Sequence, residues 1–148
     1  MEAIKLLKQD HDEVKKIMEK LDSTTERGVK TREELFTKLK NEMEVHEIIE
    51  EEIFYPALKE HPKAKEIVLE GYEEHHVVDT IIGEISAVPY DDETWGAKFS
   101  VMKENIEHHI EEEEGDMFKT ARQVLSKQEL EELGERMEQR KATATAKV

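Results

Sequence analysis

Apolar residues recur at spacings of three and four along nearly the whole chain, which places them on one face of an α-helix. Comparable stripes run through residues 1–22, 31–60, 63–87 and 94–114, and short polar segments containing Gly or Pro separate them. No segment alternates at period two, as a half-buried strand would. The pattern therefore predicts an all-α fold, an up-down-up-down four-helix bundle.

Two capping motifs and one proline mark the expected helix ends. Thr31 with Glu34 has the spacing of a capping box at the start of the second helix, and Ser126 with Glu129 has it further on. Pro56 falls inside the last turns of the second helix and should bend or end it, because proline lacks the amide hydrogen.

The segment from Ser126 to about Gln139 is expected to form a short fifth helix across the end of the bundle. Beyond Arg140 the sequence is rich in Ala, Thr and Lys, and a tail of this kind is usually disordered. We therefore expect one domain over residues 1–140 and a disordered tail over residues 141–148.

Histidine and glutamate interrupt two of the apolar stripes. His46 with Glu50, and His109 with Glu113, are four residues apart, and each pair therefore shares one helix face. With 37 acidic residues and 7 histidines such pairs also arise by chance. However, both pairs lie among core positions, where an unpaired carboxylate costs several kcal/mol. A metal cation would compensate both carboxylates.

The other two stripes each carry a histidine as well. His11 lies in the middle of the first stripe, and the third stripe selects His75 over its neighbour His76. In the fourth stripe His109 is selected over His108. A single core histidine is more often hydrogen-bonded than metal-bound, but the same feature on four helices favours a shared metal site.

The combination of four imidazoles and two carboxylates constrains the metal. It exceeds the needs of one tetrahedral zinc ion, and calcium and magnesium prefer shells of oxygen only. Carboxylates can bridge two ions while imidazoles bind each terminally, as in di-iron and di-manganese sites of helix bundles. The alternative is a buried hydrogen-bond network without metal.

The charge and composition of the chain limit the kinds of molecule that it can bind. The formal charge of −15 opposes binding to nucleic acid or to an anionic membrane, which requires Lys and Arg. The chain has no cysteine, which excludes disulfides and iron–sulfur ligation. We see no signal peptide and no membrane-spanning run, and we expect a cytoplasmic protein, either a monomer or a homodimer.

The order of these motifs resembles the hemerythrin-like (HHE cation-binding) family, and the resemblance covers about residues 1–140. Glu-His-His-Val-Val-Asp on the third helix, Trp95, and the terminal Leu-Glu-Glu-Leu-Gly-Glu-Arg-Met segment are similar to the mycobacterial-type members. The resemblance implies a non-haem di-iron centre, two Fe ions with an oxo or hydroxo bridge. Carried over by position, it makes His11, His46, His75 and His109 terminal ligands, and Glu50 and Glu113 bridging ligands.

One position departs from the oxygen-carrying hemerythrins. Those proteins have a second histidine one turn after His75, where this chain has Asp79. One iron would then lack an imidazole and would gain a carboxylate, a water or an open position. Glu47 and Tyr55 are possible substitutes beside the second-helix motif, although neither lies squarely in the apolar stripe.

Three functions remain open for such a centre. An open iron position favours an enzyme that decomposes hydrogen peroxide, with catalase- or peroxidase-like activity, or one that acts on NO. A module that binds or senses O2 or NO is the second hypothesis, and iron storage or delivery is the third. The sequence contains neither the Cys-containing domain of family repair proteins nor an output domain of a sensor.

Overall fold

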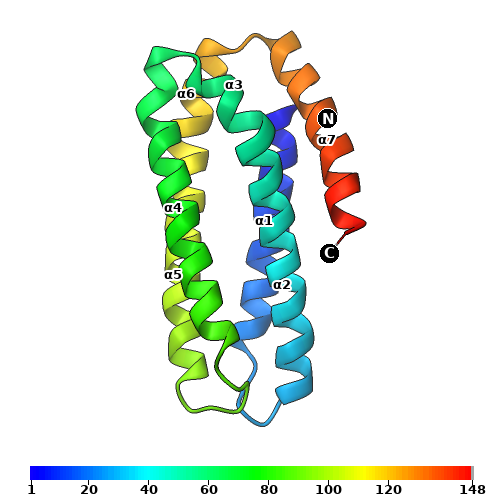
Figure 1. The fold of residues 1–148 in the computed structure, drawn as a ribbon, viewed down its shortest axis with the longest axis vertical. Coiled ribbons are helices and arrows are strands. Elements are labelled where there is room, and N and C mark those ends of the chain that lie inside the picture. Colours follow the sequence, from blue (N-terminus) through cyan, green and yellow to red (C-terminus); the bar gives the residue numbers. More distant parts are fainter. Residues whose placement is uncertain (148) are drawn as a thin grey trace.

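The computed structural model describes residues 1–147 and shows the expected up-down-up-down four-helix bundle (Figure 1). Its long helices are α1 (Ala3–Asp22), α2 (Val29–Ile49), α4 (Pro62–Ser86) and α5 (Trp95–Glu112). The part of the chain described contains no strand, which confirms the all-α prediction. None of its helices is both long and apolar enough to cross a membrane.

Two of the four long helices continue through a π-helical segment. Residues Glu50–Phe54 (η1) join α2 to α3 (Tyr55–Lys59), and residues Glu113–Met117 (η2) join α5 to α6 (Phe118–Val124). A π-helical turn contains one residue more than an α-helical turn, and such turns are frequent at functional sites. Each π-helical segment here begins at one of the two glutamates that the sequence placed in the core.

The backbone of η1 also explains the position of Pro56. The amide of Tyr55 donates to the carbonyl of Glu50, five residues back, instead of four. Pro56 follows directly, near the start of α3, where the missing amide hydrogen matters least. The helix therefore continues to Lys59 instead of ending at the proline.

The apolar core has two parts, one on each side of a polar layer. The first lies where α3, α6 and α7 (Lys127–Thr145) meet the bundle, and the second lies toward the loops that join α1 to α2 and α4 to α5 (Figure 1). On every long helix a buried histidine separates the two parts. Representative residues are Ile4, Leu7, Phe54, Leu58 and Phe118 in the first part, and Val14, Met18, Phe36, Trp95 and Phe99 in the second.

The two capping predictions had different outcomes. Ser126 accepts from the amide of Glu129 and the Glu129 side chain accepts in return, so the capping box before α7 is confirmed. The Thr31 capping box is wrong, because α2 already begins at Val29, after Gly28, and no side chain caps it.

The end of the chain is more ordered than expected. Helix α7 runs to Thr145 and lies along α1 and α2 instead of across the end of the bundle (Figure 1). Lys141 forms an ion pair with Asp10, a buried carboxylate that needs a cationic partner, and Ala144 is buried. These contacts order residues 141–145, where we expected a disordered tail, and Val148 lies outside the described residues.

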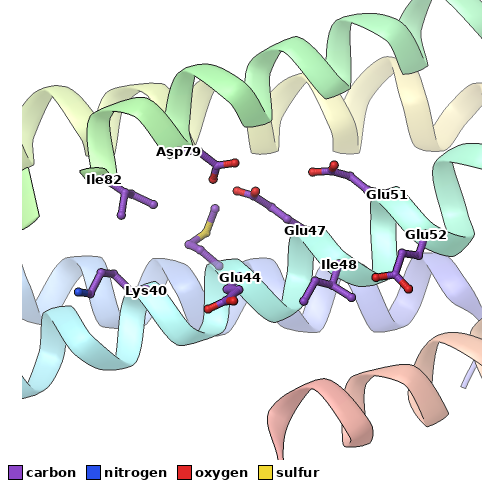
Figure 2. A pocket seen from close by; sticks show the side chains of 9 residues that line it. Lys40, Glu44, Glu47, Ile48, Glu51, Glu52, Asp79 and Ile82 are labelled. Carbon is purple, nitrogen blue, oxygen red and sulfur yellow. The ribbon is translucent and has the colours of Figure 1, made fainter. Parts of the chain in front are cut away.

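A pocket of about 490 Å³ opens on the face between α2 and α4 (Figure 2). Its walls carry several carboxylates, and its floor lies close to the polar layer of the bundle. Its lining includes Glu44, Glu47, Glu51, Glu52 and Asp79.

The docking of α7 depends on a close backbone approach at Gly134. A Cβ atom there would lie 2.0 Å from the carbonyl oxygen of Met1. We expect Gly134→Ala to lower the free energy of unfolding by about 1–3 kcal/mol, the usual cost of overpacking. Gly83→Ala is the control, because a Cβ atom there would meet nothing within 4 Å. We expect this substitution to raise the free energy of unfolding by about 0.5–1 kcal/mol, since alanine favours the helix over glycine. Equal denaturant midpoints for the two variants would contradict this account of α7.

Candidate metal centre

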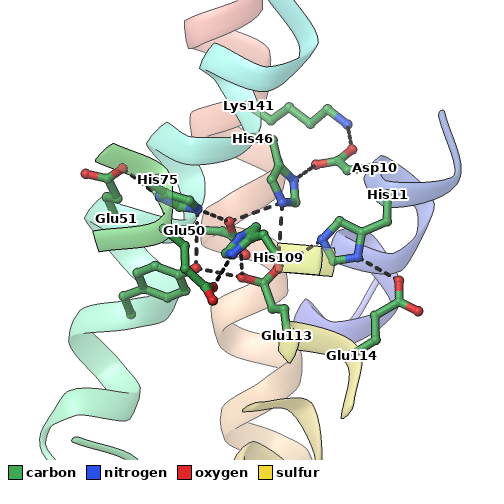
Figure 3. A network of polar contacts seen from close by, with 12 residues as sticks. Asp10, His11, His46, Glu50, Glu51, His75, His109, Glu113, Glu114 and Lys141 are labelled. Atoms are coloured by element: carbon green, nitrogen blue, oxygen red, sulfur yellow. Dashed lines mark hydrogen bonds and ion pairs between the residues drawn. The ribbon is translucent and has the colours of Figure 1, made fainter. Parts of the chain in front are cut away.

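The structure brings the six titratable core residues of the sequence analysis into one cluster (Figure 3). Each of the four long helices supplies one histidine, and the two π-helical segments each supply a glutamate. Every member is at most 3% exposed. The residues are His11, His46, Glu50, His75, His109 and Glu113.

The cluster consists of two overlapping groups of four. One group contains His11 and His46, the other contains His75 and His109, and both contain Glu50 and Glu113. Within each group the candidate ligand atoms all lie within 4.8 Å of one another. Two groups that share their carboxylates have the composition of a site for two ions with two bridging ligands.

All four imidazoles direct Nε2 toward the shared carboxylates. Each Nε2 atom lies close to one carboxylate oxygen, so a cation could bind between the two atoms in place of this direct contact. The distances are 2.9 Å from His11 to Glu113, 3.1 Å from His46 to Glu50, 3.0 Å from His75 to Glu50, and 3.2 Å from His109 to Glu113.

Three inward-facing atoms lack a well-aligned hydrogen bond among the described residues, although the two imidazole nitrogens among them lie close to a carboxylate oxygen. They are Nε2 of His46, Nε2 of His109 and Oε2 of Glu50. A buried polar atom left unpaired costs about 1–3 kcal/mol. A cation that accepts the lone pairs of these atoms removes that cost, and the mixed nitrogen and oxygen donors suit a transition metal. The residues therefore fit the metal centre that the sequence predicts.

A second set of carboxylates surrounds the cluster and holds the outer nitrogen of each imidazole, and Figure 3 labels Asp10, Glu51 and Glu114 among them. An Nδ1–H that donates to a carboxylate fixes the tautomer, leaves the Nε2 lone pair inward and orients the ring toward a metal. The four bonds are His11 to Glu114 at 2.7 Å, His46 to Asp10 at 2.9 Å, His75 to Glu51 at 2.8 Å, and His109 to Glu74 at 2.6 Å.

These four bonds form a closed ring around the bundle. In each bond the carboxylate and the imidazole come from different helical segments, so the ring connects α1 to α2, η1 to α4, α4 to α5, and η2 back to α1. These carboxylates could not be singled out from the sequence, although each one directly precedes or follows a member of the cluster. The chain has 37 acidic residues, so a carboxylate next to a cluster residue is expected by chance and does not stand out.

In the absence of a cation His46, His75 and His109 retain protons, because their pKa values are raised. Burial alone lowers the pKa of His75, but hydrogen bonds with Glu50 and Glu51 outweigh it and raise the pKa to about 9. At His109 burial is likewise outweighed, here by the charge of Glu113, and the pKa rises to about 10. The pKa of His46 is also raised well above its usual value, against burial, by the charge of Glu50.

Tyr55 lies inside the cluster, contrary to its expected place beside the apolar stripe. Its side chain is fully buried, its hydroxyl donates to Oε2 of Glu113 at 2.6 Å, and the hydroxyl oxygen lies 3.3 Å from Nε2 of His75. The π-helical turn of η1 causes the difference, because the extra residue rotates Tyr55 relative to a regular α-helix. Burial raises the pKa of the Tyr55 phenol well above its usual value, which keeps it protonated.

Glu47 and Asp79 lie on the pocket side of this cluster, not within it. Asp79 is exposed and faces Glu47 across the pocket (Figure 2). Glu51, and not Asp79, accepts the proton of the His75 ring. Burial raises the pKa of Glu47 to about 9.

The competing histidines lie where the stripes predict. His76 and His108 are exposed, and His61 directly precedes α4 in the link after α3. None of these three side chains belongs to the cluster. The helical periodicity alone was therefore sufficient to choose between the neighbours in each His-His pair.

Comparisons with known proteins identify the family of this chain. Residues 2–121 match the family described as Hemerythrin HHE cation binding domain. The chain is 31% identical over 141 residues to proteins of Mycobacterium tuberculosis, Rv2633c, and of Mycobacterium bovis, Mb2666c, and the alignment covers 93% of this chain and 83% of each relative. The chain belongs to the hemerythrin HHE cation-binding domain family.

A solved structure shows the same fold. It is the crystal structure of a hemerythrin HHE cation binding domain-containing protein, an Rv2633c homologue from Mycobacterium kansasii. It superposes with a TM-score of 0.90 at 28% sequence identity, over 99% of this chain and 89% of that protein. The bundle with its additional C-terminal helix is thus shared with a hemerythrin-like protein.

The outer carboxylates should influence metal affinity without contacting the metal. We expect Glu74→Ala to weaken binding by about 10- to 100-fold, the usual effect of removing the acceptor of a ligand histidine. Glu73→Ala is the matched control, because Glu73 is adjacent and exposed and has no contact with His109. Competition with a chelator of known affinity measures the metal affinity of both variants. Equal affinities would refute the proposal that Glu74 orients the His109 ring.

Stability should depend on pH in opposite ways with and without metal. The raised pKa values of His75 and His109 stabilise the metal-free fold below pH 6.5, and that stability is lost as pH rises through about 9 to 10. Metal binding requires neutral imidazoles and therefore strengthens over the same range. We expect the difference in Tm between loaded and chelator-treated protein to widen from pH 6.5 to about 9. A constant difference would contradict the imidazole assignment.

Proposed function

We propose that the cluster binds two iron ions and that the protein decomposes hydrogen peroxide at this centre. The observation that supports it most directly is the pair of overlapping groups that share Glu50 and Glu113. His11 and His46 would hold one ion, His75 and His109 the other, and the two glutamates would bridge them. Iron suits this balance of imidazole and carboxylate donors, and the bound pair supplies the capacity to exchange electrons with an oxidant.

The enclosure of the centre limits what can reach it. Each group of four offers only two imidazoles and two shared carboxylates, which leaves coordination positions for a small molecule. All the ligand residues are buried, and the Phe118 ring stacks on His11 with centroids 5.9 Å apart. These surroundings favour hydrogen peroxide, O2 or NO over larger substrates and exclude bulk water from the reacting atoms.

Tyr55 favours peroxide chemistry over simple gas binding. Its hydroxyl donates to Glu113 and lies 3.3 Å from Nε2 of His75, and the raised pKa of the phenol keeps the hydroxyl protonated at neutral pH. Reduction of one hydrogen peroxide to two waters takes up two protons and two electrons, and oxidation of a second hydrogen peroxide to O2 returns both. Tyr55, whose hydroxyl lies 2.6 Å from a candidate bridging carboxylate, can give up one of these protons in the first half and regain it in the second. Reversible binding of O2 or NO, the second candidate function, rests on the same enclosed cluster but assigns no role to this proton.

The experiment is peroxide decomposition by protein reconstituted with iron(II). We expect about two irons per chain, because the donors form two groups of four that share only the two glutamates. We also expect release of O2 from hydrogen peroxide faster than with an equal amount of free ferric ion. Glu50→Ala should lose paired binding and the activity together, whereas Glu111→Ala, at an exposed position on α5, should retain both.

Two outcomes would overturn the proposal. One tightly bound zinc and no iron would exclude the di-iron centre. Two irons with peroxide consumption no faster than by free ferric ion would exclude the enzyme, and changes in the visible spectrum on adding O2 or NO would then identify the protein as a gas-binding module.

A further inference from the structure

The pocket between α2 and α4 is a second concentration of acidic side chains, outside the metal centre (Figure 2). Five of its nine lining residues are acidic, and Lys40 is its one basic residue. Carboxylates gathered in a concave site raise the local concentration of cations. Acidic surfaces are common in this chain, however, and the cluster alone does not define a site.

The side chain of Glu47 is a second reason, independent of the acidic surface, to regard this pocket as a binding site. Its side chain is only 7% exposed, its carboxylate points into the pocket, and Oε2 has no hydrogen-bond partner among residues 1–147 (Figure 2). A buried carboxyl group beside other carboxyl groups is costly to ionise unless a cation binds next to it. Glu47 therefore lacks a positively charged partner at the place where it is aimed.

Two further carboxylates surround the same point. Glu51 is near enough that its oxygen, that of Glu47 and a ring nitrogen of His75 all lie within 4.8 Å of one another. Asp79 reaches toward Glu47 from α4 on the opposite wall (Figure 2). Oxygen ligands from two helices thus converge on one space, as a cation site requires.

The basic groups nearby are engaged elsewhere. The ammonium of Lys40 lies over the ring of Phe36, 5.4 Å from its centroid. Arg140 forms a two-pronged ion pair with Glu52, at 2.9 and 3.0 Å, which neutralises the outermost acidic residue of the pocket. Within the described part of the chain, no Lys or Arg side chain forms an ion pair with Glu47, Glu51 or Asp79.

We propose that Glu47, Glu51 and Asp79 form a binding site for a divalent transition-metal cation, through which iron(II) passes on its way to the buried centre. The binding site stands on its own geometry, and its role in loading rests on the proposed function. Carboxylates with adjacent solvent suit a hydrated divalent ion that has to be released again, in contrast to the imidazole-rich centre.

Glu51 connects the two sites. It follows Glu50 directly in the sequence, and its Oε2 accepts from Nδ1 of His75 while its other oxygen remains available to a cation. The Nε2 atom of the same imidazole faces the centre, 3.0 Å from Glu50. A second pocket, of about 440 Å³, reaches His75 from the outer side of Glu51. Glu51 and His75 therefore connect the pocket between α2 and α4 with the centre.

Manganese(II) is the probe for the site itself. Protein already loaded with iron is titrated with Mn²⁺, and the loss of the free-ion EPR signal counts the bound ions. We expect about one additional Mn²⁺ per chain, and we expect Asp79→Asn and Glu47→Gln to lose it while their iron content stays equal to the wild type. Glu44→Gln removes an equal charge from the exposed rim of the same pocket and should retain the ion.

The rate of iron loading tests the route. Metal-free protein is mixed with limiting iron(II), and a strong chelator added at intervals captures what has not yet reached the centre. We expect Asp79→Asn to slow incorporation by about tenfold, the effect of weakening one carboxylate ligand by about 1.4 kcal/mol, without changing the final iron content. Equal slowing by Glu44→Gln would show general electrostatic attraction and would overturn the route.

The outcomes separate this proposal from the function of the centre. Two irons per chain with no additional Mn²⁺, or with Mn²⁺ that survives both substitutions, reject the carboxylate site and leave the centre intact. Mn²⁺ that binds and is lost on both substitutions in a protein that takes up no iron pair supports the carboxylate site and rejects the proposed function.

Discussion

Two carboxylates in the middle of an apolar bundle are the constraint on which the rest of this structure depends. Glu50 and Glu113 are essentially inaccessible to water, and charges in such a place are tolerated only with close partners. Four imidazoles provide those partners, one from each long helix, and four outer carboxylates in turn hold the imidazoles. Each shell of polar residues thus exists because the shell inside it would otherwise be unpaired.

The π-helical segments are the backbone counterpart of this constraint. Both begin at a shared glutamate, and both are followed by an aromatic residue that closes the site, Tyr55 after η1 and Phe118 after η2. One additional residue in a turn changes which side chains face inward. It brings the Tyr55 hydroxyl to Glu113 and stacks Phe118 on His11 while the two glutamates remain in the core.

The sequence was sufficient for the bundle and for the six inner residues, because both follow from one helical period extended over long segments. The same period chose His75 over His76 and His109 over His108. It failed where the backbone leaves that period, so the inward position of Tyr55 was missed. It also failed where partners come from different helices, as with Lys141 and Asp10, since no spacing along one helix reveals a contact between two. Order in residues 141–145 was missed for that reason.

The ring of imidazole–carboxylate bonds also has a consequence for the handedness of the bundle. Apolar stripes alone allow four helices to be arranged clockwise or anticlockwise with the same faces inward. Asp10 and Glu74 each precede the histidine of their own helix by one residue, so each points to one flank only, about 100° from that histidine. In the mirror arrangement Asp10 would face α5 instead of α2, and the His46 ring would lose its acceptor. The polar shell therefore selects one chirality of the fold that hydrophobic burial leaves undetermined.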